Sequence, residues 1–231
     1  MVLWPIILMC VTLLSPGDGE TADLMDQYLS IRGSYVFVRR APENTQPDKI
    51  FVTVFEDFHC PACYNATTRV FPLLKEKYGN RLEIHFLGIP LAHPDSRLAA
   101  RAYIIAHELG FGEAMQNALF RAHFEEEMDT ASKDGLAKVA DSIGLAPELL
   151  LSQLESDGGV AEVERNITQA DSYQVDSTPT LILDGWIKIS DVSPANVTQV
   201  IDGLLEKKKL VGNTMVPPPN KPSSKGRKVS P

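Results

Sequence analysis

Two cysteines three positions apart, Cys60 and Cys63, are the residues of this chain best suited to redox chemistry. They stand in the string Cys-Pro-Ala-Cys, with Pro61 and Ala62 between them. Two thiols at this spacing can close a disulfide ring, so one sulfur can attack a disulfide while the other resolves the mixed disulfide. The pattern predicts a redox dithiol, in which Cys60 attacks or is attacked and Cys63 resolves.

The segments around the cysteines are expected to place Cys60 at the start of a helix. Residues 52–55 are β-branched or aromatic, which predicts a buried strand. Pro61 suits the first helical turn, Pro72 should kink the helix, and Gly79 should end it. The free N–H groups and dipole at a helix N-terminus favour an anion, so the Cys60 thiol should lose its proton easily.

Other interpretations of the Cys-x-x-Cys string remain open. A zinc site needs four ligands, and the one further cysteine is Cys10, so His59 or His93 would have to complete it. A structural disulfide or a chance spacing would also give the string. The redox dithiol is preferred because strand, cysteine pair and helix agree, and we expect neither metal nor cofactor.

The N-terminal residues 1–19 are interpreted as a signal peptide. An apolar run over residues 2–14 is followed by small residues that suit cleavage, and it is too short to span a bilayer. No Lys or Arg precedes the run, and an N-terminal buried helix is the alternative. A cleaved leader predicts a soluble exported protein, periplasmic or extracellular, where disulfides persist.

Charge is distributed unevenly along the chain. The net charge is −8, yet residues 207–231 carry seven Lys or Arg and no acid, which leaves −14 on residues 20–206. An acidic body argues against nucleic-acid binding. The basic end is rich in Pro, Ser and Gly, so residues 207–231 are predicted to be a disordered tail.

Hydrophobic periodicity divides the rest of the chain into a strand-bearing body and a helical block. A short helical pattern falls in residues 20–33, and strands are expected at 34–38 and 82–86, at 180–183 and after the Asp184-Gly185 turn. Residues 93–174 carry helical patterns, and a last helix opens at Pro194. The predicted organisation is a domain in two parts, residues 20–92 and 175–206, with a helical domain, 93–174, inserted between them.

A second group of residues, Ser177-Thr178-Pro179-Thr180, directly precedes the predicted hairpin. A proline that enters a buried strand gives up a sheet hydrogen bond, so its presence needs a reason. Together with the cysteine pair, this string resembles the DsbA-like branch of the thioredoxin superfamily. The similarity covers about residues 50–206, and its matching strings are residues 55–63 (FEDFHCPAC), 90–99 (PLAHPDSRLA) and 177–180 with the Asp184-Gly185 hairpin.

The resemblance implies an α/β chain: a thioredoxin fold with an inserted all-helical domain. It implies that Cys60 is the exposed nucleophile, that Cys63 is its buried partner and that Pro179 is a cis-proline facing them. Thr178 would then offer backbone hydrogen bonds to an extended substrate. The chain departs from the family's best-known oxidase at Ala62, where that oxidase has a histidine.

Residues just before the cysteines are candidates for tuning them. A carboxylate here could relay the proton of Cys63, and Asp57 is preferred over Glu56 because it is nearer the turn. A solvated acidic loop is the alternative. His59 directly precedes Cys60 and could stabilise its thiolate, with a purely structural role as the alternative.

These features predict an exported thiol–disulfide oxidoreductase that donates disulfides to secreted or periplasmic proteins. A reductase or isomerase of the same fold is the enzymatic alternative, and a chaperone-like peptide-binding protein is the alternative from another class. The expected partners are cysteine-containing unfolded or extended proteins and a redox-recycling partner. The chain itself is expected to be a monomer.

Overall fold

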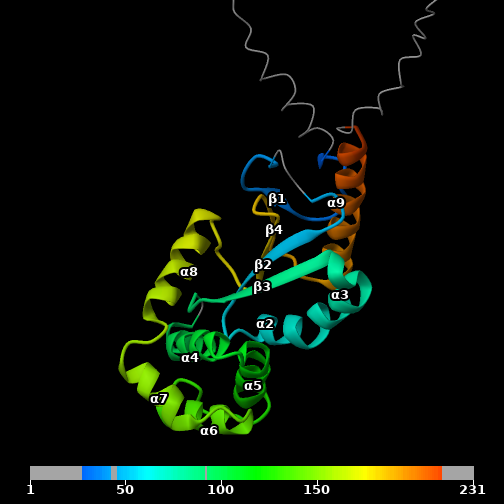
Figure 1. The fold of residues 1–231 in the computed structure, drawn as a ribbon. Coiled ribbons are helices and arrows are strands. Elements are labelled where there is room, and N and C mark those ends of the chain that lie inside the picture. The colour runs from blue at the N-terminus through cyan, green and yellow to red at the C-terminus, as the bar shows by residue number, and fades with distance from the viewer. Residues whose placement is uncertain (1–27, 43–45, 92, 215–231) are drawn as a thin grey trace, which may run out of the picture.

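A five-stranded mixed sheet lies at the centre of the structure, a computed structural model that describes residues 28–42, 46–91 and 93–214 (Figure 1). The strand order is β1-β5-β4-β2-β3. Strands β2 and β3 run parallel, whereas β4 is antiparallel to β2 and β5 is antiparallel to both β4 and β1. The strands span Val36–Phe37 (β1), Ile50–Glu56 (β2), Leu82–Gly88 (β3), Thr180–Leu183 (β4) and Ile187–Ile189 (β5).

Helices cover both faces of the sheet and form a separate block beyond one end of it (Figure 1). The helical elements are α2 (Pro61–Asn65), η1 (Ala66–Val70), α3 (Phe71–Tyr78), η2 (Gly79–Arg81), η3 (Pro94–Ser96), α4 (Arg97–Glu108), α5 (Gly112–Phe124), α6 (Lys133–Ser142), α7 (Pro147–Glu155), α8 (Val160–Ser172) and α9 (Pro194–Thr214). None of the helices in the described ranges is both long and apolar enough to cross a membrane.

Strand β2, which pairs with both β3 and β4, is buried on both faces toward its carboxyl end. Ile50, Val52 and Val54 point to one face, where they share a hydrophobic cluster with residues of α3 and α9. Phe55 points to the other face and packs with Ile182 and with residues from the end of α8. This alternation builds three layers, helix on sheet on helix, and confirms the predicted α/β class.

The active-site helix is continuous from Pro61 to Tyr78 but changes its winding midway. Residues of η1 are π-helical, and the N–H of Phe71 donates to the carbonyl of Ala66. The sequence predicted a kink at Pro72. The structure places Pro72 in the first turn of α3, where its missing N–H is tolerated, and the π-turn precedes it. Gly79, with φ of +54°, ends the helix as predicted.

The inserted block comprises α4 to α7, and α8 leads from it back along the sheet (Figure 1). Its helices enclose their own hydrophobic cluster, which extends to Cys60, Cys63 and Phe58 beside the sheet. The Phe58 ring lies 5.3 Å from the rings of both Tyr103 and Phe120. Helices α4 and α5 of the insertion therefore pack against the loop that precedes Cys60.

The predicted tail boundary at residue 207 is wrong, because α9 continues to Thr214. Lys208 is only 1% exposed, and its ammonium donates to Asp184 Oδ2 at 2.8 Å and to the carbonyl of Lys49. A lysine can be buried when its charge is paired and hydrogen-bonded in this way. Residues 215–231, the signal peptide expected at 1–19, and most of the helix expected in 20–33 lie outside the described residues.

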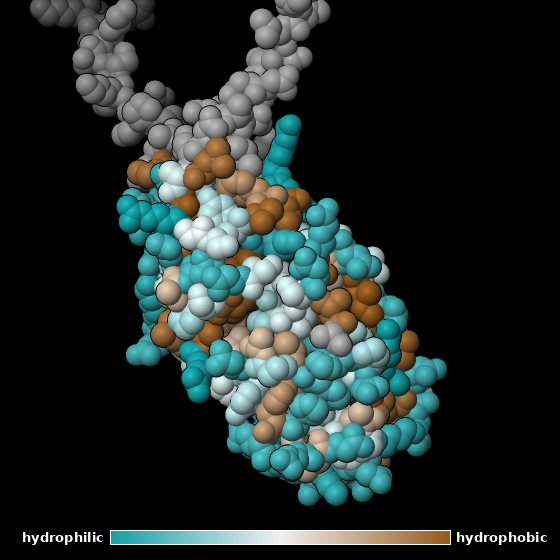
Figure 2. Space-filling view, turned by 180° about the vertical axis from the view of Figure 1, so that it is seen from behind, coloured by the Kyte–Doolittle hydropathy of each residue, from teal (hydrophilic) through white to brown (hydrophobic). Residues whose placement is uncertain are grey.

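Figure 2 shows the rear of the molecule. Hydrophilic residues dominate the end formed by the helical block, and apolar residues gather toward the opposite end, near the first and last described residues. Exposed apolar side chains include Leu29, Val36 and Leu210.

Candidate active site

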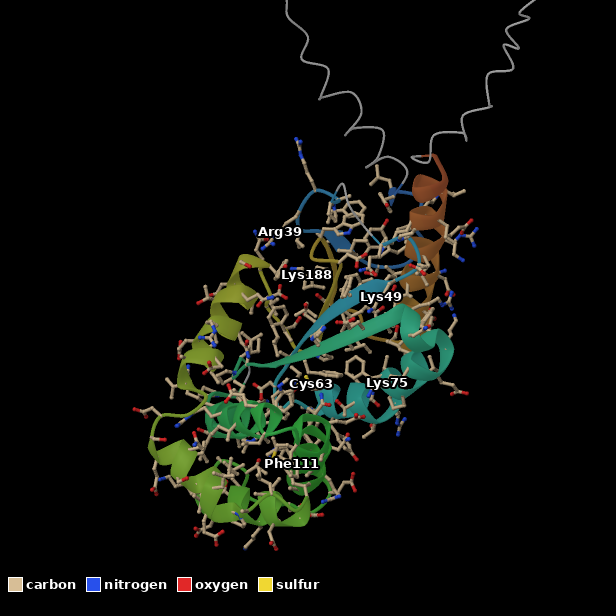
Figure 3. The ribbon with its side chains drawn as sticks, in the orientation of Figure 1. Arg39, Lys49, Cys63, Lys75, Phe111 and Lys188 are labelled. Atoms are coloured by element: carbon tan, nitrogen blue, oxygen red, sulfur yellow. The ribbon has the colours of Figure 1, made fainter. Side chains whose placement is uncertain are left out.

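Cys60 occupies the N-cap position of α2, with Pro61 at the first position of the helix. Its extended backbone, with φ of −88° and ψ of 119°, ends the loop that follows β2. The side chain is 8% exposed, whereas Cys63, one turn later, is completely buried. Both thiols are free, so the structure shows the dithiol form. Figure 3 labels Cys63 where the active-site helix meets the helical block.

The two thiols have opposite acid strengths. The pKa of Cys60 is lowered from 9.0 to about 5, chiefly because the Cys63 thiol donates a hydrogen bond to it. Burial opposes this effect, whereas the neighbouring Thr178 and hydrogen bonds from the backbone N–H groups of Cys63 and Ala62 add to it. The pKa of Cys63 is raised, first by burial and then by the neighbouring Cys60 and Glu56. Cys60 is therefore the thiolate and Cys63 the proton-bearing partner.

The loop before β4 faces the cysteines from a distant part of the chain. The Thr178–Pro179 peptide bond is cis, as the family resemblance implied. Cys60 Sγ lies 3.2 Å from the carbonyl oxygen of Thr178, to which the protonated thiol donates. Thr180 Oγ1 donates to the Ser177 carbonyl at 2.8 Å and fixes the turn. Cys60, Cys63, Thr178 and Pro179 thus form one site.

Asp57 is placed as a capping residue of the active-site loop. Its Oδ1 accepts the N–H of His59 at 2.9 Å and its Oδ2 accepts the N–H of His93 at 3.1 Å. The carboxylate thereby ties the loop before α2 to the loop before η3. The N–H of Asp57 also points at Cys63 Sγ over 3.4 Å, and a role of its carboxylate as a proton relay stays a prediction.

His59 turns toward the helical block. Its Nε2 lies 2.9 Å from Thr130 Oγ1, and its ring stacks on that of His123 with 4.1 Å between centroids and 3° between planes. The pKa of His59 is lowered by burial and by His123. Among the described residues, the groups that lower the pKa of Cys60 are those of α2 and Thr178, so His59 holds the loop rather than tuning the thiolate.

The carboxylate best placed to affect Cys63 is Glu56, which the sequence analysis ranked second. It is completely buried at the end of β2, and its Oε1 accepts a hydrogen bond of 2.7 Å from Gln116 Nε2. Burial raises the pKa of Glu56 to about 8. The alternation of side chains along a strand could have indicated this position from the sequence. Glu56 follows Val52 and Val54 on the face that the active-site helix covers.

The described residues contain no group of three or more His, Cys, Asp or Glu side chains arranged to hold a metal ion. What the geometry does provide is a pair of thiols of opposite acid strength, at the start of a helix and opposite a cis-proline loop. This arrangement is that of a protein-disulfide oxidoreductase of the thioredoxin fold.

Comparisons with known proteins support this assignment as a protein-disulfide oxidoreductase. Residues 51–203 match the family model of the DSBA-like thioredoxin domain. The thiol:disulfide interchange protein DsbA of Pseudomonas aeruginosa is 24% identical over 169 residues, which cover 71% of this chain and 79% of that protein. The probable disulfide bond formation protein D of Bacillus anthracis is 24% identical over 193 residues, which cover 76% of this chain and 84% of that protein. The chain belongs to the DSBA-like thioredoxin domain family.

Solved structures show the same fold. The crystal structure of Pseudomonas aeruginosa DsbA superposes with a TM-score of 0.63 at 23% identity and covers 78% of this chain and 95% of that one. Oxidised BdbD from Bacillus subtilis gives a TM-score of 0.62 at 19% identity, and the match covers 75% of this chain and 93% of that one. Both cover most of the strand-bearing body and the helical insertion, so the predicted thioredoxin fold with a helical insertion is confirmed.

Proposed function

We propose that this thiol–disulfide oxidoreductase donates its Cys60–Cys63 disulfide to cysteine-containing proteins. The observation that carries the proposal is the low pKa of Cys60, about 5, beside the raised pKa of Cys63. A stable Cys60 thiolate favours the dithiol over the disulfide, and a protein whose dithiol is stabilised is an oxidant of other thiols.

The proposed reaction has two exchanges. A substrate thiolate attacks Cys60 Sγ, the Cys60–Cys63 bond breaks, and Cys63 leaves as a thiolate that takes up a proton. A second substrate thiolate then attacks the substrate sulfur of the mixed disulfide and expels Cys60 as a thiolate. The substrate loses two electrons and gains a disulfide, and the protein is left as the dithiol.

The Thr178–Pro179 loop is proposed to hold the substrate during both exchanges. Its Thr178 carbonyl already lies within hydrogen-bond distance of Cys60. An extended chain laid against this loop could pair with its backbone, as in strand addition. Such recognition uses main-chain groups, so it suits varied unfolded or extended proteins.

Export and recycling complete the proposal. We place the protein in the periplasm or outside the cell as a monomer, since a disulfide donor works where disulfides persist. The names of the Pseudomonas and Bacillus relatives, which refer to disulfide interchange and formation, agree with this role. After each turnover a recycling partner must remove two electrons from the Cys60–Cys63 dithiol.

A reductase or isomerase is the second candidate, and Ala62 is the observation that favours it. Its methyl group adds no positive charge near the Cys60 thiolate. We therefore expect a reduction potential between about −120 mV, that of a strong oxidase, and about −270 mV, that of thioredoxin. Equilibration with glutathione buffers measures it, and a value at the lower limit would favour the reductase.

Substitution of each cysteine tests the assignment of roles. Cys60→Ser should abolish disulfide exchange, whereas Cys63→Ala should accumulate mixed disulfides because the resolving thiol is missing. In the wild type, alkylation at mildly acidic pH should label Cys60 first, as the thiolate. Labelling of Cys63 first would reverse the roles. Full suppression of substrate aggregation by a variant lacking both cysteines would favour the chaperone-like alternative.

A further inference from the structure

The end of the molecule opposite the helical block exposes large apolar side chains. Leu29, Val36 and Leu210 are 62%, 57% and 52% exposed. The chain before β1 packs on α9, where Tyr28 shares a hydrophobic cluster with Leu204. Figure 2 shows apolar residues gathered at this end, beside the first and last described residues. Exposed apolar side chains that gather in this way mark an interaction surface.

Basic residues accompany these apolar side chains. Residues 28–42 contain three exposed arginines and neither Asp nor Glu. The arginines are Arg32, Arg39 and Arg40. In the last part of α9, Lys207 is half-buried and Lys209 is exposed, and residues 215–231, which follow α9, carry four Lys or Arg and no acid. Residues 28–42 and 207–210 are called the terminal face below; they combine exposed apolar and basic groups.

The rest of the chain is acidic. Residues 20–206 carry −14 although they include the three arginines, so positive charge is concentrated at the terminal face and in residues 215–231. Glu206, next to Lys207, offsets one of these positive charges. A negatively charged surface would attract this end and repel the acidic remainder, which orients the molecule before contact.

We propose that the terminal face, together with residues 215–231, docks on a membrane that contains anionic phospholipids. Its Arg and Lys side chains contact the lipid phosphates, and Leu29, Val36 and Leu210 enter the layer between headgroups and acyl chains. The helical block then points away from the lipid, and the Cys60–Cys63 pair stays in the aqueous phase (Figure 1). This inference concerns where the protein works, and it holds whichever direction the disulfide exchange takes.

Two other occupants fit the terminal face less well. A second copy would have to pair along β1, which is only two residues long, and would bring its own arginines against those of the first copy. A soluble polyanion would bind the basic groups but would leave Leu29, Val36 and Leu210 in water. A membrane offers phosphates above hydrocarbon, which suits both kinds of side chain at once.

Co-sedimentation with lipid vesicles tests the docking. The chain used is 20–231, because every described residue follows residue 27 and the apolar run at 2–14 could itself insert into lipid. We expect this chain to sediment with vesicles of phosphatidylglycerol and phosphatidylethanolamine but not with vesicles of phosphatidylcholine alone. Salt at about 1 M, which shortens the range of charge interactions to about 3 Å, should release it.

Charge reversal identifies the groups that contact the lipid. Lys207→Glu combined with Lys209→Glu should lower the vesicle partition coefficient by at least about tenfold, since each basic residue at an anionic surface contributes to binding. Truncation after Thr214 should lower it by a similar factor, because it removes four basic residues. Lys133→Glu combined with Lys138→Glu is the matched control: it makes the same change of charge on α6, in the helical block, and should bind like the wild type.

Tryptophan fluorescence tests the orientation. The chain 20–231 has one tryptophan, Trp186, which is buried. Leu210→Trp adds an exposed indole on the terminal face, whereas Leu109→Trp adds one in the helical block, where Leu109 is 41% exposed. Brominated lipids quench indoles that reach the acyl chains. They should quench Leu210→Trp and leave Leu109→Trp at the level of the wild type.

Several results would overturn the proposal. Three of them are equal binding to the anionic and neutral vesicles, wild-type binding by the double variant at Lys207 and Lys209, and quenching of Leu109→Trp in place of Leu210→Trp. Retention on heparin without binding to vesicles would overturn it in favour of a soluble polyanion. Dimers that Leu210→Glu dissociates, in a protein that does not bind vesicles, would overturn it in favour of a second copy.

Discussion

Cys60 and Cys63 are chemically identical side chains whose surroundings give them different roles. Cys60 lies at the N-terminus of α2, where a carbonyl, a thiol and backbone N–H groups surround its sulfur. Cys63 lies one turn deeper, against apolar residues of the helical block and near Glu56. Position along a single helical turn therefore separates the attacking sulfur from the resolving one.

This difference predicts how the stability of the reduced form depends on pH. The folded pKa of Cys60, about 5, lies below its ordinary value of 9.0, so between these values the unfolded chain holds a proton that the folded chain has released. The contribution of Cys60 to the free energy of unfolding of the reduced form should therefore rise with pH across this window and fall as pH decreases toward 5. The oxidised form has no thiol and lacks this contribution.

Urea unfolding of both redox forms between about pH 5.5 and 8.5 measures the effect. Comparing the two forms removes the contributions of groups that titrate alike in both, and only the reduced form has the Cys60 thiol. We expect the reduced form to gain stability over the oxidised form as pH rises. A difference that stays constant with pH would show that Cys60 carries no stabilised thiolate.

Short strings predicted the cysteine pair and the loop before β4, and the family resemblance implied the cis form of Pro179. It favoured Asp57 over Glu56 because nearness along the chain was the only criterion applied. Strand alternation places Glu56 on the covered face of β2, and Asp57 follows the strand. The partners Gln116, Thr130 and His123 come from the helical block, and no local pattern indicates which of its side chains reach the site.

At the scale of elements, stacked imidazoles join the active-site loop to α5. Burial lowers the pKa values of both His59 and His123, and the neighbouring imidazoles of His123 and His93, respectively, lower them further. Their folded pKa values lie below that of the unfolded chain, so stability should be lost as pH falls through about 6.5. Replacing His123 with Gln removes one titrating ring while keeping a polar side chain.

We therefore expect His123→Gln to lose less stability than the wild type between about pH 7.5 and 5. Thermal melts at both values measure this difference, and His85→Gln, which changes an exposed histidine on β3, is the matched control. Equal losses in the wild type and His123→Gln would show that the stack does not titrate in this range.

Helix α9 provides the second element-scale prediction. Lys208→Met leaves the Asp184 carboxylate, only 6% exposed on its side chain, without its cation. Breaking a buried ion pair from one side costs about 3–5 kcal/mol. We expect this loss of unfolding free energy in Lys208→Met and in a truncation after Glu206, with Lys209→Met as the exposed control. Lys208→Met as stable as Lys209→Met would mean that the pair contributes nothing.

Most elements agree with the sequence patterns because each pattern is local. These are the run of β-branched and aromatic residues in β2, the alternating apolar residues in β3, the helical stripes in α4 to α8 and the turn at Asp184-Gly185. The end of α9 does not follow from composition, since three consecutive lysines favour solvent. Lys208 is buried only because Asp184 and the Lys49 carbonyl, both distant in sequence, meet it there. The π-turn of η1 likewise lacks a signal other than Pro72.

At the scale of the whole molecule, charge and position act together. Residues 20–206 carry a net charge of −14, and Lys207, Lys208 and Lys209 stand in the last part of α9. In Figure 1 that end of α9 is at the opposite end of the molecule from the helical block that supports the cysteines. The active site should therefore lie in the negative potential of residues 20–206, and the three lysines of α9 lie far from it.

This potential predicts how salt changes the choice of disulfide. The reduced protein should attack cystamine, a cation, faster and oxidised glutathione, an anion, more slowly than their intrinsic reactivities dictate, because charge steers the encounter. Salt shortens the range of the potential to about 10 Å at 0.1 M and about 3 Å at 1 M. Raising the salt concentration should therefore slow the reaction with cystamine and speed the reaction with glutathione disulfide.

Stopped-flow kinetics measure the rates for both reagents. Each rate is divided by the rate of the same reagent with a free uncharged thiol, which removes salt effects on the reagent itself. Parallel salt dependences would show that groups next to Cys60, and not the net charge, set the field at the active site.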